Sequence, residues 1–92
     1  MKLIGKDVLY KFTSLYAEVR SQIDSWEAET EVAQWETPLD IKRRYATASF
    51  LKNSQVVFNI KGNKYRLLVK VNYENKIVLI IKAGTHKEYM RW

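Results

Sequence analysis

The sequence predicts an α+β domain, in which N-terminal helices pack on one face of a small antiparallel β-sheet. Two patterns support this class. Apolar residues recur every three or four positions in the first third of the chain, and β-branched runs separated by turn residues fill the second half. The 92 residues suffice for one hydrophobic core, so we expect a single domain over residues 1–92.

The N-terminal third is expected to be mainly helical. Met1–Ile4 is a short apolar run that predicts a small strand. From Asp7 to about Gln34 the apolar period is helical, which predicts one long helix or two in close succession. The apolar stripe consists of Val8, Phe12, Leu15, Tyr16, Val19, Ile23 and Trp26.

A further helix is predicted in the segment "ETPLDIKRRY". Thr37 suits the N-cap position, Pro38 suits the first helical position, and Asp40 falls in the electropositive first turn. The far end of the segment carries three cations, Lys42, Arg43 and Arg44. Cations stabilise a helix C-terminus, and they are equally suited to contact a phosphate backbone.

Three strands are predicted in the second half, namely "VVFNI", "YRLLVKVN" and "KIVLIIKA". Gly62-Asn63 forms a strong two-residue hairpin signal between the first two, and Glu74-Asn75 a weaker one between the last two. With these turns, Asn59 is expected to face Arg66, and Arg66 to face Ala83 on the last strand.

Strand alternation then sorts the side chains into two faces. The face expected to meet the helices carries Phe58, Ile60, Tyr65, Leu67, Val69, Val71, Val78 and Ile80. The opposite face carries Asn59, Arg66, Lys70 and Asn72 among Val57, Leu68, Ile77, Leu79 and Ile81. Because Ala83 directly precedes Gly84-Thr85-His86, we expect the C-terminal tail to leave the sheet beside Arg66.

The composition excludes several classes of site. The chain has no cysteine, so disulfides and thiolate metal sites are ruled out, and a single histidine makes a zinc site unexpected. No apolar run reaches the roughly 20 residues that span a bilayer, and the N-terminus lacks the features of a secretory signal. We therefore expect a cytoplasmic protein that uses neither a metal nor a cofactor.

The charges are segregated along the chain. Residues 1–40 hold four basic and eight acidic side chains, whereas residues 41–92 hold twelve basic and two acidic ones. A basic half of this kind favours a polyanionic partner, which is RNA, DNA or an acidic protein segment.

The sheet register brings a small set of chemically active groups to one region. Arg66 offers a forked cation for phosphate oxygens, His86 can transfer a proton near neutral pH, and Tyr89 can donate a proton or stack on a base. This set suits cleavage of an RNA phosphodiester, in which the neighbouring 2′-hydroxyl attacks the phosphorus, better than it suits acyl transfer. The alternative is that His86 lies on a solvated tail, Tyr89 packs against the sheet edge, and Arg66 is an ordinary surface residue.

The run "FNIKGNKYRLLVKVNYENKIVLIIKAGTHKEY" closely resembles the HigB toxins of bacterial toxin–antitoxin systems, relatives of the RelE group. The earlier "AQWETPLDIKRRYATASFLKNSQVVFNI" is similar to the same family's helix-to-strand passage. The resemblance covers nearly the whole chain. It implies a RelE-like fold and an mRNA interferase, an endoribonuclease that cuts messages in the ribosomal A site. It also implies a helix-turn-helix antitoxin partner of the HigA type.

The same resemblance assigns roles to individual residues. Arg66 in "YRL" matches the phosphate-binding arginine, His86 stands where several relatives have an arginine, and Tyr89 takes the place of a C-terminal tyrosine that is catalytic or stacks on bases. RelE-type enzymes carry lysines on the strand before "YRL", where this chain has Val57 and Asn59. His86 is therefore the predicted general base, and Lys64 is the second candidate.

The predicted function is thus metal-independent cleavage of mRNA with Arg66, His86 and Tyr89 as catalytic residues. The expected RNA-binding residues are Lys61, Lys64, Lys87, Asn59, Lys42, Arg43 and Arg44. Two alternatives remain at this point. One is a non-catalytic RNA-binding module with a basic sheet face, and the other is an interaction protein that docks an acidic partner.

Overall fold

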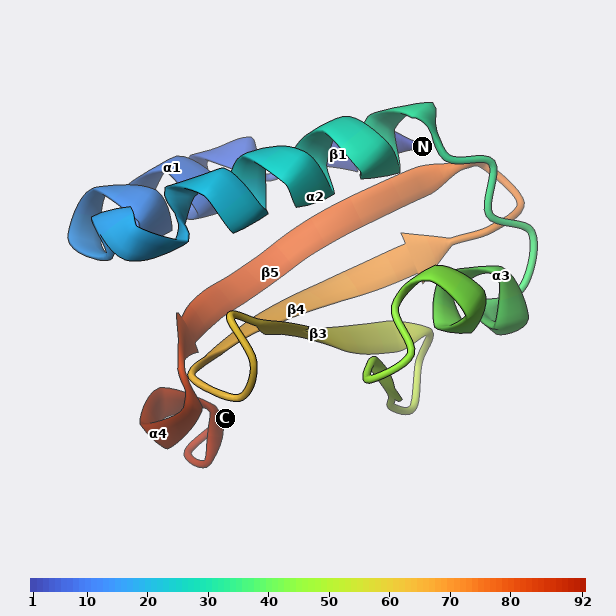
Figure 1. Cartoon of the computed structure of the whole chain (residues 1–92). Helices are drawn as coiled ribbons and strands as arrows, with labels where there is room; N and C mark the ends of the chain where they lie inside the picture. Colours follow the sequence, from blue (N-terminus) through green and yellow to red (C-terminus); the bar gives the residue numbers. More distant parts are fainter.

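The computed structural model describes residues 1–92 and has five strands in the order β1-β5-β4-β3-β2, with helices α1 and α2 over one face (Figure 1). The strands are β1 (Lys2–Ile4), β2 (Ser49–Phe50), β3 (Gln55–Ile60), β4 (Tyr65–Asn72) and β5 (Ile77–Thr85). The predicted α+β class is confirmed. The sheet is mixed rather than purely antiparallel, because β1 lies parallel to β5.

The N-terminal helical region forms two helices, which confirms one of the two expected arrangements. The helical elements are α1 (Lys6–Leu15), the 3₁₀ turn η1 (Ala17–Val19), α2 (Arg20–Val32), α3 (Pro38–Arg44) and α4 (His86–Tyr89). The buried face of α1 is formed by Leu9, Phe12 and Thr13. Leu15 lies off this face and is 69% exposed, so its place in the predicted stripe was wrong, whereas Leu9, which the stripe left out, is fully buried. No helix is both long and apolar enough to cross a membrane.

The predicted start of α3 is confirmed. The Asp40 carboxylate accepts hydrogen bonds from the backbone N–H groups of Glu36 at 2.8 Å and Thr37 at 3.1 Å. These hydrogen bonds lower the pKa of Asp40 below its usual range, since they favour the charged form. The cap fixes where the chain turns from α2 toward the edge of the sheet.

The core lies between the sheet and the N-terminal helices. All eight apolar residues predicted for the helix-facing side belong to one buried cluster. Phe58 is at its centre, with ring centroids 5.4 Å from Trp26, 6.3 Å from Trp35 and 5.1 Å from Tyr45. The expectation that Trp26 is a core residue is therefore confirmed.

The register between β3 and β4 agrees with the hairpin prediction. Asn59 pairs with Arg66 and Ile60 pairs with Tyr65. The Lys64 N–H donates to the carbonyl of Lys61 and closes the turn around Gly62. Arg66 consequently lies on the face away from α1 and α2, which is called the outer face below.

The register between β4 and β5 was only half correct. Val69 pairs with Ile80 as expected, but Arg66 pairs with Gly84 rather than Ala83. A β-bulge at Ile81 of β5 causes the difference, because this residue has no partner between Leu68 and Val69 of β4. The bulge turns Ala83 toward the core and places the side-chain-free Gly84 beside Arg66.

Gly5 provides a first prediction. It has φ +91° before α1, and an added Cβ would lie 2.7 Å from the carbonyl oxygen of Ile80. We expect Gly5→Ala to lower the free energy of unfolding by roughly 2–4 kcal/mol, from backbone strain plus a clash with β5. Gly62→Ala is the matched control, because Gly62 has φ +68° but open space around it. Urea unfolding should show a smaller loss for Gly62→Ala, of about 1–2 kcal/mol. Equal losses would contradict the close approach.

Candidate functional site

Arg66 is the central cation of the outer face. It lies on β4, in the middle of the sheet, and is 8% exposed. Its Nη1 donates to the carbonyl oxygens of Asn63 at 2.9 Å and Tyr65 at 3.2 Å. None of the ion pairs in the protein involves Arg66. A largely buried guanidinium without a carboxylate is costly to maintain, and an anion bound there would offset that cost.

The C-terminal tail folds back as the short helix α4 instead of simply leaving the sheet. Thr85 caps it: its hydroxyl accepts from the Glu88 N–H at 3.1 Å, and the Glu88 carboxylate accepts from the Thr85 N–H at 2.9 Å. The His86 N–H donates to the Lys64 carbonyl at 2.9 Å and fastens α4 beside the β3–β4 turn (Figure 1). The spacing Thr-x-x-Glu is the capping-box signature, which was available in the sequence and was missed.

Tyr89 connects the other two predicted catalytic residues. The Arg66 guanidinium carbon lies 5.3 Å from the centre of the Tyr89 ring, and the His86 ring centroid lies 6.3 Å from that of Tyr89. His86 is exposed and Tyr89 is half-buried. The structure thus places the Tyr89 phenol near both the Arg66 cation and the His86 imidazole, at the end of the sheet where β5 runs into α4. Arg66, His86 and Tyr89 are called the Arg66 cluster below.

The Glu88 carboxylate supports a prediction about pH. The hydrogen bond from the Thr85 backbone N–H lowers the pKa of Glu88 below the ordinary glutamate value. A depressed folded-state pKa stabilises the docked helix above the ordinary value, and this contribution is lost as the pH falls through the folded-state pKa. We expect the NMR shift of the Thr85 amide proton to titrate with a midpoint below that of an ordinary glutamate, about 4.3.

Glu88→Gln is the matched control, because it keeps the shape of the cap and removes the titration. In this variant the Thr85 amide shift should be flat in the same acid range. A midpoint at or above the ordinary glutamate value in the parent protein would contradict the capping geometry.

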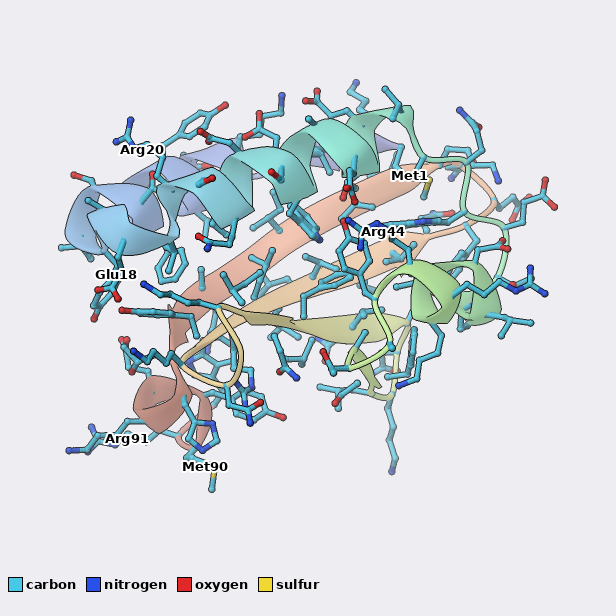
Figure 2. The ribbon with its side chains drawn as sticks, in the orientation of Figure 1. Met1, Glu18, Arg20, Arg44, Met90 and Arg91 are labelled. Carbon is cyan, nitrogen blue, oxygen red and sulfur yellow. The ribbon has the colours of Figure 1, made fainter.

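The predicted RNA-binding residues near the β3–β4 turn divide into free and occupied groups. Lys64 and Lys87 are exposed beside Arg66 and on α4, and neither forms an ion pair. Lys61 is paired with Glu18 at 3.3 Å, where Glu18 projects from the turn between α1 and α2 (Figure 2). Asn59 neighbours Arg66 in the register, but its amide donates to the carbonyl of Thr47 at 3.2 Å.

The three cations of α3 are not brought to this cluster, because α3 and α4 lie at different ends of the sheet (Figure 1). Lys42 donates to the carbonyl of Ala48 at 3.0 Å, and Arg44 pairs with Glu29 at 2.6 Å. Arg43 lies 3.8 Å from Asp40 of its own helix. These contacts give the three side chains roles within the fold.

Two residues beside the Arg66 cluster, Lys82 and Trp92, were not predicted from the sequence. The Lys82 ammonium lies 5.8 Å from the centre of the Trp92 ring, and that ring lies 5.5 Å from the Tyr89 ring. The bulge in β5 explains why Lys82 was missed, since it pairs with Leu68 on the outer face. A regular strand would have turned it toward the helices.

Comparison with known protein families gives a match over most of the chain. The family model HigB_toxin, described as the RelE-like toxic component of a toxin-antitoxin system, matches residues 19–92. None of the curated proteins matches the chain. The matched range takes in α2, α3, four of the five strands and all of α4, and therefore includes Arg66, His86 and Tyr89.

Proposed function

Because the chain belongs to the HigB_toxin family of RelE-like toxic components of toxin–antitoxin systems, we propose that it acts by cleaving messenger RNA. One observation supports this most directly: the Tyr89 ring lies 5.3 Å from the guanidinium carbon of Arg66 and 6.3 Å from the ring of His86. A charged fork beside two groups able to move protons suits attack on a phosphodiester by a neighbouring hydroxyl.

Each residue has a defined part in the proposed reaction. His86 takes the proton of the 2′-hydroxyl, and the freed oxygen attacks the adjacent phosphorus. Arg66 binds the non-bridging oxygens as negative charge builds on them. Tyr89 gives its proton to the 5′-oxygen as the bond from phosphorus to that oxygen breaks. The products are a 2′,3′-cyclic phosphate and a free 5′-hydroxyl. Lys64 and Lys87 hold the flanking phosphates by charge.

A toxic component of such a system has an antitoxin as partner. We propose that this antitoxin is a helix-turn-helix protein of the HigA type and that the toxin acts in the cytoplasm, on mRNA in the ribosomal A site. Co-expression with the neighbouring open reading frame tests the partner. We expect the co-expressed protein to restore growth and to co-purify with the toxin. Continued growth arrest, with the toxin purified on its own, would contradict this partner.

The activity is tested with purified protein and mRNA-programmed ribosomes, with the same mRNA alone in parallel. We expect cleaved messages that end in 2′,3′-cyclic phosphates and a rate reduced about 10²- to 10⁴-fold in His86→Ala, the range for loss of a general base. Tyr89→Phe should also be slower, whereas the matched control Tyr10→Phe should be unchanged, because Tyr10 is exposed on α1. An intact message in both samples would contradict the proposal and favour the alternative of a non-catalytic RNA-binding module.

A further inference from the structure

A second feature of the outer face lies next to the Arg66 cluster and shares only Tyr89 with the proposed reaction. It is a cavity of about 390 Å³ between β3, β4 and the end of the chain. Val57 and Leu68 form its floor, and Leu51, Met90 and Trp92 form much of its rim. Its volume lies within the range of about 300–1,000 Å³ that is usual for small-ligand sites.

The rim exposes apolar side chains that a folded domain normally covers. Leu51 is 44% exposed, Met90 is 70% exposed and Trp92 is 38% exposed. Met90 projects from the end of α4 away from the strands (Figure 2). The floor residues Val57 and Leu68 are buried beneath them, although both lie on the outer face. Exposed apolar groups gathered around a cavity indicate a binding site.

The charges around this cavity favour one kind of occupant. Arg66 lies against the Tyr89 ring and Lys82 against the Trp92 ring, so each aromatic wall has a cation beside it. No carboxylate lines the cavity. An apolar and aromatic slot flanked by cations matches a flat, uncharged base attached to a charged phosphate. An acidic peptide would find the cations but would place its carboxylates against an apolar floor.

One lining residue can distinguish between bases. Gln55 is held through its backbone, with its N–H donating to Lys52 and its carbonyl accepting from Leu51. Its side chain lies in the cavity wall, and an amide carries both a donor and an acceptor. Such a group can pair with the edge of a base, and it would be left unpaired by a base with the wrong pattern.

We propose that this cavity holds an unstacked base of single-stranded RNA beside the phosphate bound by Arg66, with Trp92 as the stacking surface and Gln55 as the group that selects the base. The assignment rests on the proposed RNA-cleaving function and adds a site of base selection to it. Trp92 and Gln55 are binding residues, and neither takes part in the chemical step.

The test uses short 2′-O-methyl RNA oligonucleotides of a single base type, one each for A, C, G and U. The blocked 2′-oxygen prevents cleavage, so binding is measured separately from reaction. Indole N–H signals in NMR spectra report each tryptophan, and we expect the Trp92 signal to move on binding. Trp26 and Trp35 are internal controls, because they are only 2% and 6% exposed.

Three variants complete the test. Trp92→Ala should weaken oligonucleotide binding roughly tenfold, as loss of one stacked base predicts. Trp92→Phe should retain most of the affinity, and Gln55→Leu should change the order of preference among the four oligonucleotides. Val32→Ala is the matched control for loss of an exposed apolar side chain, since Val32 is 78% exposed at the end of α2.

The outcomes separate this inference from the proposed function. A moving Trp92 signal and an altered base order in Gln55→Leu support the base site, even when ribosome assays show no cleavage. An unmoved Trp92 signal, or variants that bind all four oligonucleotides like the parent, overturn it even when mRNA is cleaved. Poly-glutamate that moves the Trp92 signal while every oligonucleotide fails also overturns it, in favour of an acidic protein partner.

Discussion

Replacing Arg66 by alanine is expected to lower the rate of mRNA cleavage by about 10²- to 10³-fold and to abolish growth arrest when the protein is expressed without its antitoxin. The expected size is that for losing one preorganised group that stabilises developing negative charge. Arg66 is suited to this role because it is nearly buried yet has no acidic partner. Its guanidinium group is oriented by hydrogen bonds to the carbonyl oxygens of Asn63 and Tyr65.

Two further variants decide what the Arg66 result means. Arg66→Lys keeps the charge but loses the planar fork, so we expect only partial recovery of activity. Arg20→Ala removes an arginine that is exposed at the start of α2, away from α4 (Figure 2), and should cleave like the parent. Circular dichroism spectra would confirm that all three variants are folded. A folded Arg66→Ala protein with parental activity would remove Arg66 from the catalytic role.

The sequence was informative wherever local rules determine structure. The Pro38 helix start, the turn at Gly62 and the pairing of Asn59 with Arg66 all follow from local residue preferences and were confirmed. The apolar alternation of β3 and β4 likewise identified the core face, because a one-residue slip would have exposed Phe58 and buried Arg66 among the helices.

The errors arose where tertiary structure adds a residue or turns the chain. The β-bulge at Ile81 has no signature in an apolar run such as "KIVLIIKA", so the prediction placed Ala83 where Gly84 lies. The same error hid Lys82 from the outer face. The parallel pairing of β1 with β5 was also beyond the local pattern, because the two strands are far apart in the sequence.

The candidate site was predicted in part for the same reason. Residues fixed by strand register, such as Arg66, could be placed, whereas the cavity beside it depends on how α4 folds back over the outer face. Gly84 allows α4 to pack closely against β5, since an added Cβ at this position would lie 3.1 Å from the Glu88 carboxylate. The wall formed by Trp92 therefore depends on a contact between the last strand and the last helix.

The largest effect on stability is expected from Phe58→Ala. Phe58 is 1% exposed and touches three aromatic rings from α2, the segment before α3 and the segment after it. Truncation leaves a cavity that these large rings cannot easily fill, so we expect a loss of about 3–5 kcal/mol in the free energy of unfolding. For a domain of this size that corresponds to a melting temperature lower by at least about 12 °C.

Phe50→Ala is the matched control for Phe58→Ala. Phe50 lies on the two-residue edge strand β2 and is 39% exposed, with the Lys42 ammonium 6.0 Å from its ring. Its removal should cost no more than about 1 kcal/mol, because little buried surface and one weak cation–π contact are lost. Thermal unfolding followed by circular dichroism compares the two directly. Similar melting temperatures for both variants would mean that the aromatic cluster around Phe58 does not hold α2 and α3 against the sheet.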